Sequence, residues 1–261
     1  RRLSGKLNLD ITSMRGDAST PSYAEQSAYD AVTDTLAKYP EGATLGAVVG
    51  ALQRELEADH PYQPLLAKLL QFQEIKDTNL RFVEMIPGTK GSGVGRLVLD
   101  SSNKPRIILS KKWFGANGLN PVEGLHAMLH EMVHAATVGN IIGPMYGNRE
   151  LRNRIDLLRK IAREKFGDRF DYATSDVYEF VAEAYTNAEF QRALKDYKAA
   201  ELAKSSIWNR FVNIVRTFMG LDTEFTDLLD AVMTITSDTF GSMPFDKYSK
   251  RVVDLEGAGL N

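Results

Sequence analysis

Apolar residues recur every three to four positions in the first third of the chain, after a polar start. Residues 1–20 are rich in Ser, Thr, Gly and Arg and show no periodicity, which is typical of a linker. Amphipathic helices produce the three-to-four spacing that follows, and three segments carry it: 24–36, 45–56 and 64–72. We therefore predict a linker-like segment over 1–20 and an N-terminal helical region over 21–76.

The pattern changes near Asp77 to short runs of branched residues separated by Gly, Ser and Asn. Such runs are typical of the strands of a small sheet: LRFVEM (80–85), GRLVLD (95–100) and PRIILS (105–110). Helical spacing then returns and continues towards the end of the chain. The sequence thus predicts an α+β fold, with a core over 77–200 and C-terminal helices over 201–261 packed on that core.

One predicted helix concentrates the histidines, because three of the four in the chain lie between residues 126 and 136, in HAMLHEMVHAA. It starts at Pro121, and one apolar face follows at three-to-four spacing: Val122, Leu125, Met128, Leu129, Met132, Val133 and Ala136. His130 and His134 lie off that face. Residues four apart on a helix are separated by about 6 Å along the axis and about 40° around it, so both imidazoles can reach one ion.

The segment HEMVH (130–134) has the HExxH pattern of a catalytic zinc site. Such a site takes three protein ligands and keeps one position for water, while a neighbouring carboxylate accepts the proton of that water. Glu131 projects to the side of the two histidines and suits this general-base role. The chain has no cysteine, so a metal must bind histidine nitrogen and carboxylate oxygen. HExxH also arises by chance on amphipathic helices, so a third ligand has to decide between a zinc site and a chance match.

A second predicted helix, SDVYEFVAEAYTNAEF (175–190), offers that ligand. Glu179 and Glu183 are four residues apart and point away from its apolar stripe. Glu179 is the preferred ligand, with Glu183 accepting the free ring N–H of a histidine ligand, His130 in the first instance. In the alternative, Glu179 reaches back to cap the helix with Asp176, and Glu183 becomes the ligand.

These segments resemble a known family. HEMVH followed 45 residues later by Glu179 in YEFVAEAY, with Tyr172 seven residues before that glutamate, resembles the catalytic domain of anthrax lethal factor and its relatives, which are gluzincin-type zinc endopeptidases. The sequence EFVAEAYTNAEFQ, with the later SSIWNRFVNIVRTFMGL, also resembles zincin modules in large polyvalent proteins of bacteriophages and other mobile elements. The similarity covers about residues 100–220.

The resemblance implies a zincin-like fold, in which a small β-sheet, the HExxH helix and the glutamate helix are flanked by helices at both ends. It further implies Zn²⁺ as cofactor, bound by His130, His134 and Glu179, with Glu131 as general base. Tyr172 would stabilise the developing oxyanion or protonate the leaving group. Without the resemblance, Tyr172 is one of ten tyrosines and reads as a packing residue in a loop.

Composition narrows the choice of partners. The 32 basic and 34 acidic residues give a formal net charge of −2, which does not favour nucleic acid or an anionic membrane. No apolar run reaches the about 18 residues that suggest a membrane span. Oligomeric state and localisation stay open: we expect a soluble chain, and the resemblance to mobile-element proteins suggests a virion-associated protein or one delivered into a bacterial cytoplasm. Because Arg1 is not an initiator methionine, we expect a piece of a longer polypeptide.

Three further features are given structural interpretations. His126 would close the open coordination position if it bound the metal, so we expect a polar role behind or beside the site. The basic segment 149–169 is interpreted as a solvated helix rather than a phosphate-binding one. GTKGSGVG (88–95) lacks the GK[ST] ending of a phosphate loop and precedes a strand, so it predicts a hairpin loop.

The function predicted from the sequence is that of a zinc-dependent endopeptidase. Because PRIILS (105–110) immediately precedes the connection to the histidine helix, we expect it to offer a free edge that pairs with an extended polypeptide. Two alternatives remain: a zinc-stabilised binding or virion-structural module without turnover, and a zinc hydrolase of non-peptide amides such as cell-wall material.

Overall fold

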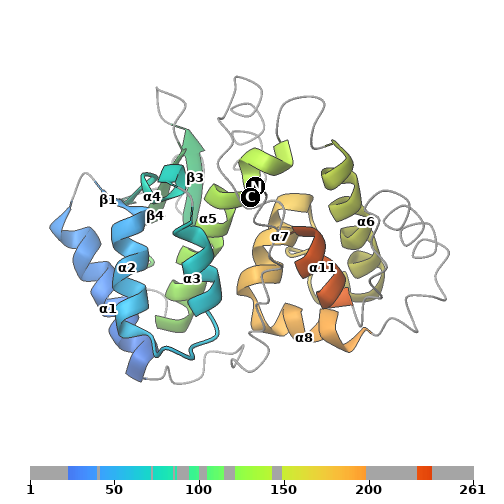
Figure 1. The fold of residues 1–261 in the computed structure, drawn as a ribbon, viewed down its shortest axis with the longest axis horizontal. Helices are drawn as coiled ribbons and strands as arrows, with labels where there is room; N and C mark the ends of the chain where they lie inside the picture. Colours follow the sequence, from blue (N-terminus) through green and yellow to red (C-terminus); the bar gives the residue numbers. More distant parts are fainter. Residues whose placement is uncertain are drawn as a thin grey trace.

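The histidine helix α5 lies between two groups of secondary-structure elements (Figure 1). On one side are the sheet and helices α1 to α4, and on the other are α6, α7, α8 and α11. This computed structural model describes a set of ranges that exclude both ends of the chain: 23–39, 42–71, 73–84, 86, 94–99, 105–114, 121–142, 149–197 and 228–236.

The described chain from 23 to 76 is mostly helical. Its elements are α1 (Tyr23–Lys38), the short β1 (Ala43–Thr44), α2 (Leu45–Glu55), α3 (Gln63–Leu69) and α4 (Gln73–Lys76). Thr44 begins α2 by accepting a hydrogen bond from the backbone N–H of Ala47, as expected for an N-cap threonine. The periodic apolar residues of α2 are buried, which explains the spacing seen in the sequence.

The sheet is mixed and has the strand order β1-β2-β4-β3. The strands β2 (Asn79–Val83), β3 (Gly95–Leu99) and β4 (Pro105–Ser110) match the three predicted segments. The pairings of β1 with β2 and of β3 with β4 are antiparallel, whereas β2 and β4 pair in parallel. The sequence did not indicate β1, which is only two residues long.

The prediction that 105–110 offers a free edge is wrong. This segment is β4, which pairs with β2 on one side and with β3 on the other. Its residues Ile107, Ile108 and Leu109 are consecutive and buried, as is typical of a strand covered on both faces. Among the described strands, β3 ends the sheet on this side.

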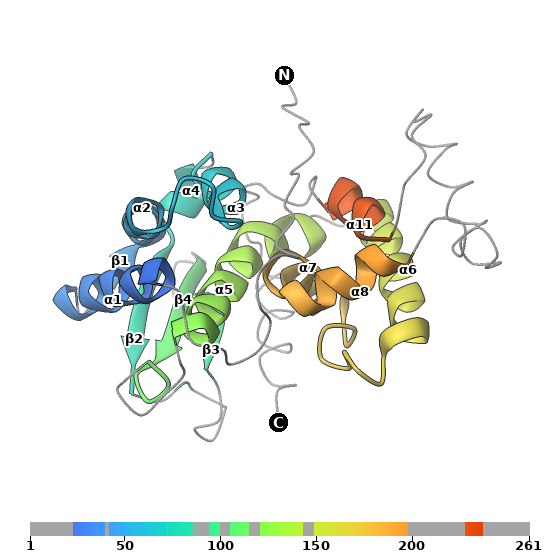
Figure 2. The same ribbon diagram turned by 90° about the horizontal axis from the view of Figure 1, so that it is seen from below.

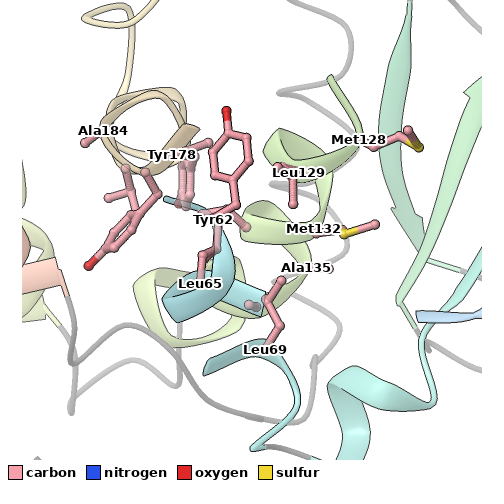
Figure 3. Close-up of a cluster of buried hydrophobic side chains, with 14 of the residues drawn as sticks. Tyr62, Leu65, Leu69, Met128, Leu129, Met132, Ala135, Tyr178 and Ala184 are labelled. Atoms are coloured by element: carbon pink, nitrogen blue, oxygen red, sulfur yellow. The ribbon is translucent and has the colours of Figure 1, made fainter. Parts of the chain in front are cut away.

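Helix α5 (Pro121–Ile142) packs on β3 and β4 and, on its other side, on α7. Figure 2 shows it crossing the middle of the molecule. The core around it is apolar, and Figure 3 shows side chains that α5, α7, α3 and the residue before α3 contribute to it: Tyr62, Leu65, Leu69, Met128, Leu129, Met132, Ala135, Tyr178 and Ala184. The apolar face of α5 thus packs in the core, and its polar face, which carries His130 and His134, is available to bind a ligand.

The remaining helices are α6 (Arg149–Phe166), α7 (Val177–Thr186), α8 (Ala188–Asp196) and α11 (Leu228–Thr236). Helix α11 packs against the other three, and the rest of 201–261, which the sequence predicts as C-terminal helices, lies outside the described residues. The segment 207–220 and most of the glycine-rich loop 88–95 lie outside the described residues. None of the described helices is both long and apolar enough to cross a lipid bilayer.

Candidate metal centre

The two histidines of HEMVH lie on the side of α5 that faces α7. Met128, Leu129, Met132 and Val133 are almost fully buried and fix the rotation of the helix. His130 and His134 then project together, with side chains 7% and 12% exposed. The HExxH spacing therefore places both imidazoles on the same side of the helix, as 3.6 residues per turn predicts.

Helix α7 brings both glutamates to the histidines. Asp176 is its N-cap and accepts hydrogen bonds from the backbone N–H groups of Tyr178 (2.8 Å) and Glu179 (3.0 Å). The carboxylate of Glu179 extends instead towards His130 and His134. The sequence left open whether Glu179 binds a metal or reaches back to cap the helix. In the structure the side chain of Asp176 caps the helix, and Glu179 is available for a metal.

Three donor atoms converge. Nε2 of His130 lies 2.9 Å from Oε2 of Glu179 and 2.9 Å from Nε2 of His134, and the third side of the triangle, from His134 to Glu179, measures 3.5 Å. Zinc bound at about 2.0–2.1 Å with tetrahedral angles separates its nitrogen and oxygen ligands by about 3.3 Å. These three residues form a group that could hold a metal ion.

The protonation of His130 is also compatible with a bound cation. Nδ1 of His130 lies 3.0 Å from Oε1 of Glu183, which favours placing a proton on Nδ1. In the neutral ring, Nε2 then carries a lone pair that faces the carboxylate of Glu179. Lone pairs at this distance repel one another unless a proton or a metal lies between them, so the donor set suits a divalent cation.

Charge within the site shifts the pKa values strongly when no metal is present. Burial alone would lower the pKa of His130, but the carboxylates of Glu179 and Glu183 raise it well above its usual value. Burial opposes ionisation of Glu179, yet His134 and His130 hold its pKa far below the usual range. The pKa of Glu183 is lowered in the same way, chiefly by its contact with His130 against the effect of burial. Positive charge at the triangle, whether proton or metal, is therefore strongly favoured.

His126 lies one helical turn before His130 and faces the same glutamate. Its Nε2 is 3.6 Å from Oε1 of Glu183, whose other oxygen accepts a hydrogen bond of 2.7 Å from the Asn187 side chain. His126, His130 and Glu183 are a second group of donors near enough to share an ion. Binding metals at both groups would require His130 to lose both ring protons, so we assign His126 and Glu183 to the support of His130.

Glu131 lies beside the triangle and against β3. The backbone N–H of Leu97 acts on its carboxylate and lowers its pKa. Burial raises the pKa of Glu131, and the nearby His134 and His130 counteract part of that rise. A carboxylate with a raised pKa next to a metal position is suited to taking up and releasing a proton.

Tyr172 is brought to the same place by the loop before α7. Its ring centre lies 6.0 Å from that of His130, the residue is 42% exposed, and its hydroxyl is near the charge of Glu179. Burial of the hydroxyl and the negative charge of Glu179 raise the pKa of Tyr172, so it stays protonated and can donate.

The loop that carries Tyr172 is held by two arginines of α6, a role that the sequence did not indicate. Arg159 donates to the backbone carbonyls of Thr174 (2.8 Å) and Ser175 (3.3 Å), and Arg163 donates to that of Thr174 (3.2 Å). Arg159 also forms an ion pair with Asp156 at 2.7 Å. Part of the basic face of this helix therefore holds the loop from within the protein.

Comparison with protein-family models, with curated proteins and with solved structures finds no match for this chain. The family resemblance therefore depends on the motif residues, and the functional argument depends on the geometry just described.

Proposed function

We propose that this protein is a zinc-dependent endopeptidase. The observation that carries the proposal is the convergence of His130 Nε2, His134 Nε2 and Glu179 Oε2, within 2.9–3.5 Å of one another and near enough to Glu131 to shift its pKa. Two imidazoles and one carboxylate are the ligand set of one class of catalytic zinc sites, and they leave a coordination position open.

Zinc bound to these three residues would polarise a substrate carbonyl and lower the pKa of a coordinated water. Glu131 would take a proton from the water that attacks the carbonyl carbon. It would then deliver that proton to the amide nitrogen of the leaving group, which balances the hydrolysis. The raised pKa of Glu131 brings it closer to neutrality, where a group can both accept and return a proton.

Two further residues support the reaction. Tyr172 remains protonated and donates to the oxygen that becomes negative in the transition state, which is a stabilising effect absent from the ground state. Glu183 holds the proton of His130 on Nδ1 and so directs the Nε2 lone pair towards the metal. Each of these roles follows from where the side chain lies and from its protonation.

The substrate model places an extended polypeptide along β3. Ser110 donates to the carbonyl of Val94 (2.9 Å), and in an antiparallel pair the hydrogen-bonded positions alternate. The backbone groups of Gly95, Leu97 and Leu99 therefore point away from β4 and towards the edge. An extended peptide added there would pair with the edge-facing groups of Gly95 and Leu99 and would lie next to Glu131, on which the Leu97 N–H acts.

A non-catalytic zinc module is the main competing function. A purely structural site saturates its metal with protein ligands and has no use for an adjacent carboxylate. The position of Glu131, near the three donors without belonging to their triangle, favours catalysis. A hydrolase of non-peptide amides would share the same chemistry and differ only in what binds along β3.

The test of the proposal is Glu131→Gln in the zinc-loaded protein, assayed by mass spectrometry on a denatured proteome. We expect the variant to bind zinc like the parent and to lose the general-base contribution of about 10²–10⁴-fold in cleavage rate. Glu84→Gln, an exposed glutamate, is the matched control and should cleave normally. Equal cleavage by Glu131→Gln and parent would refute the mechanism, and a parent that binds zinc without cleaving any peptide would favour the structural alternative.

A further inference from the structure

Gly95, the first residue of the edge strand β3, lies directly under the side chain of Glu131. A Cβ atom placed on Gly95 would be 2.8 Å from Cγ of Glu131 and 3.2 Å from its Oε1. The same Cβ would be 3.1 Å from Cδ2 of the buried Leu109 on β4. Any side chain at this position would therefore have to displace Glu131.

A second contact two residues along the same strand fixes the other end of Glu131. The backbone N–H of Leu97 acts on the Glu131 carboxylate and lowers its pKa against the effect of burial. Gly95 and Leu97 have the same parity in the strand, so their backbone groups point to the same edge, away from β4. Glu131 thus lies along that edge, with its aliphatic part over Gly95 and its charge on Leu97.

We propose that Gly95 and the Leu97 amide together form a seat that positions the general base. The role of Glu131 as a general base rests on the proposed function, whereas its position against Gly95 and Leu97 does not. The absence of a side chain at Gly95 lets the acidic side chain approach the strand, and the amide of Leu97 fixes the direction of its carboxylate. The glycine is accordingly required by the neighbouring helix.

This seat has a chemical purpose. A carboxylate on a two-carbon side chain has several rotamers, and a general base must be within hydrogen-bond reach of the proton that it takes. Contact with Gly95 and Leu97 leaves one of these rotamers favoured before substrate arrives. Gly95 and Leu97 are positioning residues, because they touch Glu131 and not the reacting atoms.

The first test measures amide hydrogen exchange at Leu97 by NMR in metal-free protein, so it does not depend on activity. This N–H points away from β4, so we attribute its protection to Glu131. A hydrogen bond to a charged group changes the equilibrium between the closed and open amide by about tenfold or more. We expect exchange at Leu97 to be at least about tenfold faster in Glu131→Ala and in Gly95→Ala than in the parent. The exchange of Arg96, whose N–H points to β4, should not change.

Gly50→Ala is the matched control, since a Cβ there would meet nothing closer than the flexible end of Arg54 at 3.7 Å. Gly124→Ala is the structural comparison, because its Cβ would lie 2.3 Å from the ring of Tyr29 and should lower the thermal midpoint without affecting Leu97. Unchanged Leu97 exchange in Glu131→Ala would overturn the proposal even if Gly95→Ala failed to fold.

The second test uses zinc-loaded protein and a peptide that the parent cleaves. Gly95→Ala should lower kcat by about 10-fold or more, within the range of a general-base contribution, and leave KM and zinc affinity unchanged. Adding Gly95→Ala to Glu131→Gln should cause no further loss, because both act through one group. Additive losses would overturn the proposal. If the parent proved inactive, the proposed function would fail while the exchange measurement would still decide whether the seat exists.

Discussion

Nε2 of His130 lies 2.9 Å from Oε2 of Glu179, although the two residues are 49 positions apart in the chain. The contact exists because α5 and α7 pack against each other through apolar side chains and leave their polar faces opposed. One glutamate then faces Nε2 of His130, and the other, Glu183, faces its Nδ1. The two ring nitrogens thus have different partners and are expected to respond differently to mutation.

Removal of Glu179 should weaken zinc binding much more than removal of Glu183. Glu179→Ala deletes a metal bond, whereas loss of a group that orients a ligand costs about 10–100-fold in affinity. Competition with a chromogenic chelator measures both variants on one scale. His134→Ala, which deletes another ligand, should resemble Glu179→Ala, and the reverse order of the two glutamates would make Glu183 the ligand.

The stability of the metal-free protein should depend on pH in a defined direction. The pKa of His130 is raised on folding, so the stabilisation that it contributes is complete below its usual pKa of 6.5 and is lost as pH rises through the raised value. The pKa values of Glu179 and Glu183 are lowered, so their contribution is complete above 4.5 and is lost in strong acid. The thermal midpoint with chelator should therefore be highest between pH 4.5 and 6.5 and fall as the pH rises from there through the raised pKa of His130.

Zinc should reverse that dependence, because the metal competes with the proton for Nε2 of His130. Melting curves with saturating zinc should show stabilisation that grows as pH rises, and binding near neutrality should release protons into the buffer. The Glu131→Gln background removes the titration of Glu131, whose pKa burial also raises. A metal-free midpoint that increased above pH 6.5 would contradict the assigned charges.

The elements of the site could be predicted from the sequence because helical periodicity carries them. The spacing of His130 and His134, and the buried stripe of α7 around Phe180 and Val181, both follow from 3.6 residues per turn. The capping aspartate at 176 was also visible as a helix start, and only the direction of the Glu179 side chain had to come from the structure.

Strand order could not be predicted in the same way. Nothing in the composition of 105–110 distinguishes an edge strand from a central one, because both are short and rich in branched residues. The parallel pairing of β2 with β4 joins segments that are separated by the whole of β3 and its flanking loops. The sequence did not predict the contact of Gly95 with Glu131 or the hydrogen bonds of Arg159 to the Tyr172 loop for a similar reason. Each joins elements that are distant in the chain.

Arg159 should control activity through Tyr172. Arg159→Ala removes the donors to Thr174 and Ser175 and should loosen the loop, while zinc affinity stays unchanged. Loss of a donor to a developing oxyanion costs about 10²–10³-fold in kcat, so Tyr172→Phe sets the limit of the effect. Steady-state kinetics on a cleaved peptide should show a smaller loss for Arg159→Ala and none when it is added to Tyr172→Phe.

Lys160→Ala is the control for this prediction, because Lys160 pairs with the same Asp156 but is 60% exposed and makes no contact with the loop carbonyls. It should retain full activity. Arg159→Lys keeps the charge but not the planar fork of donors, so it should recover only part of the loss. A deficit of equal size in Lys160→Ala would point to the general charge of α6 instead of the loop.

Pairing of the substrate with the edge of β3 should give a period-two pattern in an N-methyl scan of a cleaved peptide. In an extended peptide alternate N–H groups face the strand, so methylation at those positions removes a hydrogen bond, and methylation between them does not. Each lost bond is worth about 0.5–1.5 kcal/mol, or roughly 2- to 12-fold in kcat/KM. Proline should act like N-methylation at the strand-facing positions, because it lacks the donor. Equal losses at every position would show that the peptide binds without strand pairing, and the substrate would then have to be selected by side-chain contacts elsewhere around Glu131.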